Sequence, residues 1–594
     1  MAPISAEQCI GGRDLTEPRL SADGSLLVHA VAHDGAAWLV LHHLDGGHQQ
    51  VLANAPGLRA GRGMGGGAWC FTAAGDAVVY VGVDGNLWLQ SLTGAPPRAL
   101  TDHGPDRSAT GPTAAPDGSS VVYVLDLAEV HRVRLADLST TRLDDGNADF
   151  CMDPFVEADS LSVRWHAWDV PDMPWDRSRV QRIDAEGHVS VVLDGGGAVQ
   201  QPRVMPDGTP TSVRDDSGWL NVHVGDRAVV AEPFEHAGPS WGPGQCSYAW
   251  SPDARSLAYT RNESGFGRLC VADLAGGVTR EVARGVHGQL SWQGTRLAAL
   301  RTGARTPTQV VVYDTATWER SVVAVGPAAG FTPDALPEPE LVEVAAIDGV
   351  VHARLYRAAE SDGRLIVWLH GGPTDQWQVT FMPRFAYWLS RGWSILVPDH
   401  RGSTGHGRAY QQALRERWGE LDVGDTLAVV RHAHDAGWAR PSHTVVMGSS
   451  AGGFTALGAV AADPDAFAAA VVLYPVTDLA DLAERSHRFE RHYTVSLVGP
   501  LPDALPRYRE RSPILHTGRL RRTPLLVLHG DGDAVVPVQQ SRVFAQRVAT
   551  SGGQVELHVY EGEGHGFRQA VNQLDEYRRV EGFLARCVPV ASRS

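Results

Sequence analysis

A short sequence phrase recurs seven times in the first half of the chain, each time as a turn of the Pro-Asp-Gly type followed by an alternating strand. The Asp-Gly pair is a strong hairpin signal because the turn needs residues that tolerate positive φ. A period of roughly 40–50 residues with several short strands per unit is typical of a β-propeller. Seven copies predict seven blades, and an irregular all-β sandwich is the alternative. The copies begin at Ser21, Thr72, Ala115, Val156, Met205, Ser251 and Ser291.

The pattern changes after a segment rich in Pro and Gly, residues 326–340. Short continuous apolar runs then alternate with helical stretches, which is typical of strands buried on both faces of a parallel sheet. The chain of 594 residues exceeds the ~250–300 residues that one core usually reaches. The sequence therefore predicts an N-terminal seven-bladed β-propeller in residues 1–335 and a C-terminal α/β-hydrolase domain in residues 336–594.

One of these apolar runs leads directly into the motif Gly448-Ser-Ser-Ala-Gly452. A strand, a G-x-S-x-G turn and a helix together form a nucleophile elbow, which lifts the central serine clear of the sheet. The helix that follows offers free N–H groups and a positive end to an oxyanion. We therefore predict Ser450 as a nucleophile and the N–H of Ala451 as an oxyanion donor.

A serine nucleophile needs a base and an acid that orients the base, in the chain order Ser, acid, His on this fold. Two later strands each end in a Gly-rich loop, His529-Gly-Asp-Gly-Asp533 and Glu561-Gly-Glu-Gly-His565. We predict Asp533 as the acid and His565 as the base, and Asp531 competes for the role of the acid. A further oxyanion donor is expected from His370-Gly-Gly-Pro373, which follows an early strand.

The amino-acid composition of the chain excludes some catalytic mechanisms and disfavours some binding partners. All 52 cationic residues are arginines, so no lysine can serve as a base or bind phosphate in a P-loop. The net charge of −16 argues against nucleic-acid binding and favours substrates with a cationic amino end. The six cysteines are scattered without metal-site spacing, and the first residues lack the pattern of a signal peptide. We expect a cytoplasmic protein with no cofactor, no metal and no membrane span.

The combination resembles the prolyl oligopeptidase family of serine peptidases, on motifs in both halves. They are His370-Gly-Gly-Pro, Arg401-Gly-Ser-Thr-Gly, Gly448-Ser-Ser-Ala-Gly-Gly, His529-Gly-Asp-Gly-Asp-Ala-Val-Val-Pro, Gly564-His-Gly-Phe, and Trp168–Asp176 and Gly238–Gly244 in the first half. The resemblance implies the triad Ser450, Asp533 and His565. It also implies a second oxyanion donor at position 406, where the family usually has a tyrosine hydroxyl and this chain has His406. We therefore expect His406 to replace that tyrosine as the donor.

The chain departs from this family at Val535, where many relatives carry Arg or Asn to grip the residue before the one that is cleaved. That departure suits a substrate with a single residue before the scissile amide. The resemblance places the specificity pocket at Tyr474–Leu479 and Ser486–Tyr493, with Val476, Phe489 and Tyr493 as apolar walls. A carboxylate must balance a substrate ammonium, and the candidates are Glu490, Glu157, Glu235 and Glu263.

These inferences predict a serine exopeptidase that acts on short peptides or small aminoacyl compounds, most simply an aminopeptidase. An acylaminoacyl or dipeptidyl peptidase and an esterase or amidase for a small metabolite or antibiotic are alternatives. A non-catalytic propeller scaffold is a further alternative, which a complete triad disfavours. The sequence leaves homo-oligomerisation open.

Overall fold

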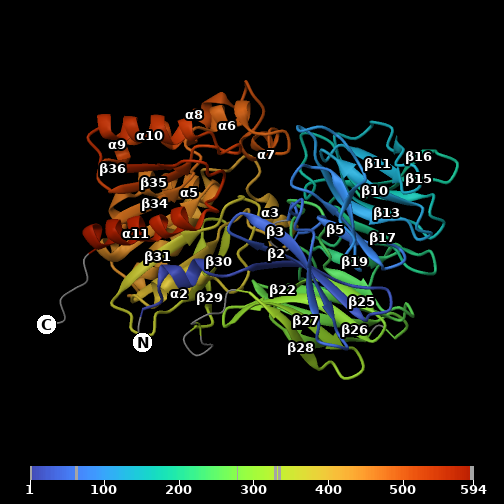
Figure 1. Cartoon of the computed structure of the whole chain (residues 1–594). Coiled ribbons are helices and arrows are strands. Elements are labelled where there is room, and N and C mark those ends of the chain that lie inside the picture. Colours follow the sequence, from blue (N-terminus) through green and yellow to red (C-terminus); the bar gives the residue numbers. More distant parts are fainter. Residues whose placement is uncertain (1–2, 61–64, 277, 327–330, 332–335, 589–594) are drawn as a thin grey trace. The chain divides into compact units, whose positions relative to one another are not determined.

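The computed structural model describes residues 3–60, 65–276, 278–326, 331 and 336–588 (Figure 1). Contacts within the chain define two compact units. One holds the described residues of 13–328 together with Gln378–Thr380, and the other holds those of 1–12, 329–377 and 381–594. Among the described residues, no helix combines the length and apolar character that crossing a membrane requires.

The first unit is the predicted seven-bladed β-propeller. Seven four-stranded antiparallel sheets follow one another along the chain, each built from four consecutive strands. Blades one to four comprise β1 (Asp14–Leu20), β2 (Leu26–His33), β3 (Ala36–His43), β4 (Gln49–Leu52), β5 (Trp69–Phe71), β6 (Ala77–Val81), β7 (Leu87–Ser91), β8 (Arg98–Ala99), β9 (Ala109–Ala114), β10 (Ser120–Leu125), β11 (Glu129–Arg134), β12 (Thr140–Arg142), β13 (Phe150–Val156), β14 (Val163–Trp168), β15 (Arg179–Ile183) and β16 (Val189–Leu193).

Blades five to seven comprise β17 (Val199–Val204), β18 (Pro210–Arg214), β19 (Asn221–Val224), β20 (Arg227–Ala228), β21 (Tyr248–Trp250), β22 (Ser256–Glu263), β23 (Phe266–Asp273), β24 (Thr279–Arg284), β25 (Val286–Gln293), β26 (Arg296–Gly303), β27 (Thr306–Asp314) and β28 (Arg320–Val325). Each repeated turn joins the first and second strands of its blade, so all seven predicted anchors fall at one structural position. Apolar packing of β1 and β2 against β26 and β27 closes the ring between the first and last blades.

The first strands of neighbouring blades contact one another around the propeller axis. The loop before β5 and the loop before β21 meet there, because the N–H of Gly66 donates to the carbonyl of Pro243 over 2.9 Å. These loops belong to the second and sixth blades, which are not neighbours in a ring of seven. Asp153 from the fourth blade accepts the N–H of Gly244 over 2.6 Å. The axis is therefore filled by backbone at this level.

The second unit is the predicted α/β-hydrolase domain, with eight strands in one sheet. They are β29 (Glu340–Ala346), β30 (Gly349–Tyr356), β31 (Arg364–Leu369), β32 (Trp393–Asp399), β33 (Thr444–Ser449), β34 (Ala469–Leu473), β35 (Leu525–Gly530) and β36 (Val555–Tyr560). Their order is β29-β30-β32-β31-β33-β34-β35-β36. β30 pairs antiparallel with β29 and with β32, whereas the six strands from β32 to β36 in this order are parallel to one another. The carboxyl ends of the parallel strands consequently share one edge, where sites form on such sheets.

Helices cover both faces of this sheet. The helices are α1 (Ala6–Ile10), α2 (Pro383–Leu389), α3 (Arg408–Gln412), α4 (Leu421–Asp435), α5 (Ala451–Ala462), α6 (Leu479–Arg485), α7 (Tyr493–Val498), α8 (Leu505–Arg511), α9 (Thr517–Leu520), α10 (Val538–Thr550) and α11 (Ala570–Cys587). Short 3₁₀ turns lie at Pro441–His443, Pro464–Ala466 and Pro513–Leu515.

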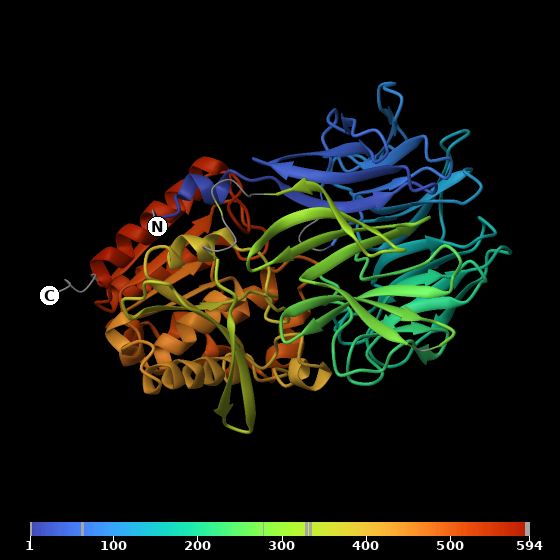
Figure 2. The same ribbon diagram turned by 90° about the horizontal axis from the view of Figure 1, so that it is seen from below.

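One large apolar core holds α4, α5 and α10 against alternate residues of the strands, among them Leu365 and Val367. Trp368, which lies between the core residues Val367 and Leu369, faces the opposite way and packs on Phe385 of α2. The helix α1 contacts α2 and α11 and belongs to the hydrolase unit, whereas a boundary at residue 335 would assign it to the propeller. Figure 2 shows the layered hydrolase unit and the blades of the propeller from below.

The filled axis predicts that Gly244 tolerates no side chain. Its φ is +79°, and an added Cβ would lie 2.1 Å from the backbone nitrogen of Gly67. Gly225 also has positive φ but has open space around it, so it is a matched control. We expect Gly225→Ala to lose only the ~1–2 kcal/mol of left-handed strain and Gly244→Ala to lose at least ~1–3 kcal/mol more through overpacking. Urea denaturation measures both, and equal losses would contradict the filled axis.

Candidate active site

The sharp turn from β33 into α5 places Ser450 at the sheet edge. Its backbone has φ 54° and ψ −123°, a strained conformation that a nucleophile elbow requires. A Cβ on Gly452 would lie 2.4 Å from the carbonyl oxygen of His370, and a Cβ on Gly448 would lie 2.3 Å from that of Gly452. Gly452 is therefore needed for α5 to pass so close to β31 and the loop that follows it, and Gly448 is needed for the tight turn from β33 into α5.

The predicted acid and base meet, although they belong to loops after different strands. Nδ1 of His565 lies 2.6 Å from Oδ2 of Asp533. The N–H groups of Val535 and Val536 donate to Oδ1 of Asp533 over 2.8 and 2.9 Å. Burial by itself would raise the pKa of Asp533, but hydrogen bonds from His529 and His565 outweigh it and hold the pKa well below its usual range. Asp533 is therefore an anion that can orient the imidazole.

The loop after β31 supplies backbone next to the serine. A Cβ on Gly371 would lie 3.7 Å from Cβ of Ser450. Nδ1 of His370 lies 2.7 Å from the carbonyl oxygen of Gly371, and its Nε2 lies 2.7 Å from the hydroxyl of Ser403. In a trans peptide the N–H points away from the carbonyl, so the N–H of Gly372 points away from His370. Gly372 and Ala451, the first residue of α5, both line the pocket described next.

A pocket opens at Ser450 and brings together residues from five segments of the hydrolase unit. Its walls include three of the predicted pocket residues, Val476, Glu490 and Tyr493, and the departure at Val535. Phe489 stacks on His487 instead and does not line it. The full lining is Gly372, Trp418, Ser450, Ala451, Val476, Leu482, Ser486, Glu490, Tyr493, Thr494, Val535 and Val536.

Sequence patterns did not single out Trp418, Leu482 and Thr494. They lie in helices or turns whose apolar residues look like ordinary core positions, so only the folded chain identifies them as pocket residues. The hydroxyl of Tyr493 has a polar role besides its predicted apolar one. It donates to Oγ1 of Thr374 and accepts the N–H of Thr374 over 3.1 Å, which ties the start of α7 to the loop after β31.

His406 lies in a buried charged cluster. Its Nε2 is 2.9 Å from Oδ2 of Asp399, and its ring stacks on His352 with centroids 4.2 Å apart. Asp399 also accepts two hydrogen bonds of 2.6 Å from the guanidinium of Arg354. Burial raises the pKa of Asp399, but Arg354 outweighs burial and keeps this pKa far below its usual range. Nε2 of His406 is thus engaged by Asp399, and the expected oxyanion role of His406 stays a prediction.

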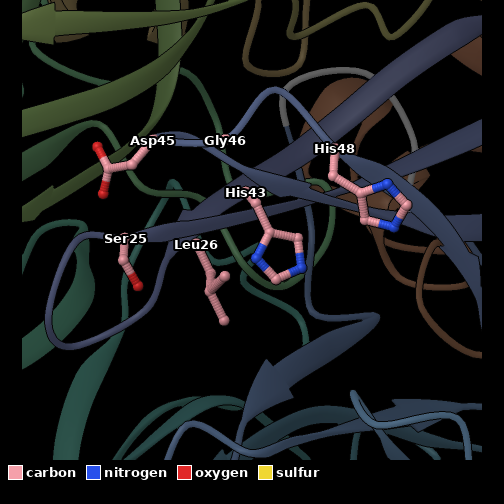
Figure 3. A pocket seen from close by; sticks show the side chains of 6 residues that line it. All are labelled: Ser25, Leu26, His43, Asp45, Gly46 and His48. Carbon is pink, nitrogen blue, oxygen red and sulfur yellow. The ribbon is translucent and has the colours of Figure 1, made fainter.

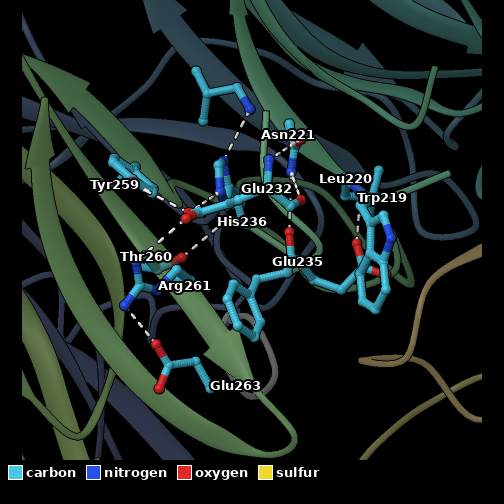
Figure 4. A network of polar contacts seen from close by, with 12 residues as sticks. Trp219, Leu220, Asn221, Glu232, Glu235, His236, Tyr259, Thr260, Arg261 and Glu263 are labelled. Carbon is cyan, nitrogen blue, oxygen red and sulfur yellow. Dashed lines mark hydrogen bonds and ion pairs between the residues drawn. The ribbon is translucent and has the colours of Figure 1, made fainter. Parts of the chain in front are cut away.

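Three of the carboxylates predicted to balance a substrate ammonium, Glu157, Glu235 and Glu263, lie in the propeller, and all three have internal partners. Glu157 pairs with Arg164 and Arg182 at 2.5 and 2.8 Å. Glu263 pairs with Arg261 and Arg268 at 2.5 and 3.0 Å, as part of the network in Figure 4. Glu235 is buried and accepts the N–H of Leu220 over 2.6 Å. These contacts already neutralise or satisfy the three side chains.

The propeller unit contains another cavity, where β2 begins and β3 ends, beside the turn from β3 to β4 (Figure 3). It is lined by Ser25, Leu26, His43, Asp45, Gly46 and His48. Asp45 forms an ion pair of 2.5 Å with Arg296. No group of three or more His, Cys, Asp or Glu side chains in the described residues is arranged to hold a metal ion.

The fold and the site define an α/β-hydrolase with a serine elbow, joined to a β-propeller. Residues 379–590 match the model of the prolyl oligopeptidase family, so the chain carries a catalytic domain of that family of serine peptidases. The resemblance seen in the motifs is confirmed at this level.

Individual relatives agree with this assignment. The acylamino-acid-releasing enzyme of Arabidopsis thaliana is 33% identical over 226 residues, which is 36% of this chain and 29% of that enzyme. The chain thus matches less than a third of the length of this curated relative. A puromycin hydrolase has a TM-score of 0.90 at 27% identity, covering 100% of this chain and 97% of that one. A puromycin-hydrolyzing peptidase of Mycobacterium tuberculosis gives 0.90 at 28%, with the same coverage.

The buried pair of Arg354 and Asp399 yields a stability prediction. Asp399→Asn leaves the guanidinium of Arg354 buried without its counter-charge, so we expect a loss of ~3–5 kcal/mol in the free energy of unfolding. The exposed pair of Arg357 and Glu340 in the same unit provides the control, because Glu340→Gln should cost under ~1 kcal/mol. Urea denaturation at neutral pH measures both. Similar losses for the two variants would show that the buried pair does not support the fold as described.

Proposed function

We propose that the protein is a serine exopeptidase that releases the N-terminal residue of short peptides or small aminoacyl amides. The observation that carries this proposal is the pocket at Ser450, which combines a nucleophile, apolar walls and the carboxylate of Glu490. A substrate with a free α-ammonium can place its side chain against Val476 and Tyr493 while Glu490 balances its charge. Val535 also fits this substrate, because its apolar side chain cannot hold a second substrate residue as the Arg or Asn of many relatives would.

In the proposed mechanism, Ser450 attacks the amide carbonyl while Nε2 of His565 takes the hydroxyl proton. Asp533 stabilises the imidazolium through Nδ1. The N–H groups of Ala451 and Gly372 stabilise the oxyanion, and His406 remains an alternative second donor. His565 then protonates the leaving amine, and water hydrolyses the acyl-enzyme.

Glu490 is the preferred ammonium acceptor for two reasons. It shares a pocket with Ser450, and the ion pair that it forms within the described part of the chain is with His487, at 3.3 Å. The carboxylates of Glu157 and Glu263 each pair with two arginines. A carboxylate that already balances two guanidinium groups has little attraction left for a substrate cation.

A second candidate is the hydrolysis of an aminoacyl antibiotic. Two structural neighbours of the whole chain are named for hydrolysis of puromycin. Puromycin contains an amino acid with a free α-amino group in amide linkage, so it meets the same requirements of the pocket. Acylaminoacyl and dipeptidyl peptidase activities remain alternatives. All six cysteines are free, in agreement with the reducing cytoplasm that we propose as its location.

Removal of the nucleophile tests the mechanism. Ser450→Ala should lower kcat by about 10⁵-fold or more, because no other group can form the acyl-enzyme. The measurement is hydrolysis of a panel of anilides with free aminoacyl, N-acetyl-aminoacyl and dipeptidyl groups, together with puromycin. Labelling by a fluorophosphonate should disappear in the variant. Retention of more than a few per cent of activity would exclude the proposed mechanism, and cleavage of blocked substrates alone would favour an acylaminoacyl peptidase.

Substrate charge recognition is tested at Glu490. Glu490→Gln should lower kcat/KM for free aminoacyl anilides by about 10²-fold, since it removes a charge-assisted hydrogen bond worth ~1.5–3 kcal/mol. The same variant should leave N-acetyl substrates almost unchanged. Glu484→Gln, at an exposed position of α6, is the matched control. An equal effect of Glu490→Gln on free and blocked substrates would assign the ammonium to another group.

A further inference from the structure

The short contact between Asp533 and His565 depends on the relative position of two loops. Asp533 follows β35, whereas His565 follows β36 and has glycines on both sides, at Gly564 and Gly566. Glycine restrains the backbone less than any other residue, so the base loop needs anchors other than its own backbone. We propose that Glu563 and Asp531 are positioning residues that lock these two loops together and hold the ring of His565 against Asp533.

The carboxylate of Glu563 anchors the base loop by accepting hydrogen bonds from residues that follow His565 in the chain. Its side chain is only 2% exposed, and its carboxylate accepts the N–H groups of Arg568 and Gln569, each over 2.9 Å. The side-chain amide of Asn572 donates to the same carboxylate over 2.9 Å. No ion pair with Glu563 occurs among the residues that the structure describes. This carboxylate therefore fixes the path of the chain from His565 into α11.

The backbone of Glu563 also contacts the acid loop. Its carbonyl accepts the N–H of Gly532 over 2.9 Å, one residue before Asp533. A Cβ on Gly530 would lie 2.4 Å from this carbonyl oxygen, so the two loops approach as closely as backbone allows. Any shift of Glu563 is thus transmitted to the residue next to the acid.

Asp531 makes the reciprocal connection from the acid loop. Its Oδ1 accepts the N–H of Gly562 over 2.8 Å, and its N–H donates to the carbonyl of Tyr560 over 3.0 Å. Asp531 was the competitor for the role of the acid, and here its side chain contacts backbone and not His565. Links from Glu563 and Asp531 therefore join the two loops just before the residues whose contact they would position.

This inference rests on the proposed triad and goes beyond it, because neither residue touches the reacting atoms. A base displaced by about 1 Å can cost about 10²-fold in rate. We expect Glu563→Ala to lower kcat about 10²-fold with little change in KM, and Asp531→Ala, at an exposed position, to lower it about tenfold. Glu563→Gln and Asp531→Asn each keep an acceptor oxygen and should recover part or most of the loss.

The experiment uses the full chain and expresses every rate per active site, after endpoint titration with a fluorophosphonate. The titration removes any effect of misfolded protein. Glu561→Ala, at an exposed position of the same loop, is the control and should match the unchanged protein. The decisive readout is the pH dependence of the fluorophosphonate labelling rate. In Glu563→Ala and Asp531→Ala its acid limb should move to lower pH, because an imidazole farther from a carboxylate binds its proton less tightly.

The labelling readout separates this inference from the substrate proposal, since it needs no peptide or amide. If the unchanged protein is labelled but hydrolyses no aminoacyl amide, the proposed function fails and the loop-locking test still stands. If Glu563→Ala and Asp531→Ala keep both the rate per active site within twofold and the pH profile of the unchanged protein, the positioning role is wrong. Because Asp531 is exposed, its variants should fold even where Glu563→Ala does not.

Discussion

The start of α5 lies directly against the end of β31, and the site depends on this close backbone approach. Gly452 touches the carbonyls of Leu369 and His370 with no space for a side chain. The same approach puts the loop of Gly371 and Gly372 beside Ser450. The proposed nucleophile and the residues of the proposed backbone oxyanion donors, Gly372 and Ala451, thus come together in one pocket, while the strained φ of Ser450 is the local cost of this arrangement.

The sequence predicts the local features well, because they rest on turn chemistry and apolar patterning. All seven repeated turns occupy the same place in their blades, and the apolar runs beginning at Leu365, Thr444 and Leu525 are strands of the parallel sheet. The serine elbow and the meeting of Asp533 with His565 were also predictable, since the fold dictates their order along the chain and the edge on which they lie.

Contacts between distant segments were not predictable from local patterns. Nothing in the sequence around Ala6–Ile10 indicates that this short helix packs on α2 and α11. The family resemblance suggested an oxyanion donor at His406, but it carried no information about Asp399 and Arg354, which come from two other strands. The same holds for Trp418 in the pocket. Such side chains acquire their roles from partners far away in sequence, and a single sequence does not reveal those pairings.

The absence of lysine has a structural consequence that composition alone did not reveal. Every internal cation is a guanidinium, which can bind a carboxylate through two parallel hydrogen bonds. Arg354 does so with Asp399, and Arg182 does so with Glu157. Carboxylates held in this way are well neutralised, so they are poor sites for a substrate ammonium. A carboxylate such as Glu490, which pairs with a histidine, therefore stands out more clearly here than it would in a protein rich in lysine. The same reasoning sets apart Glu563, whose charge is met by backbone and amide N–H groups: it serves as a rigid anchor and not as a binding site.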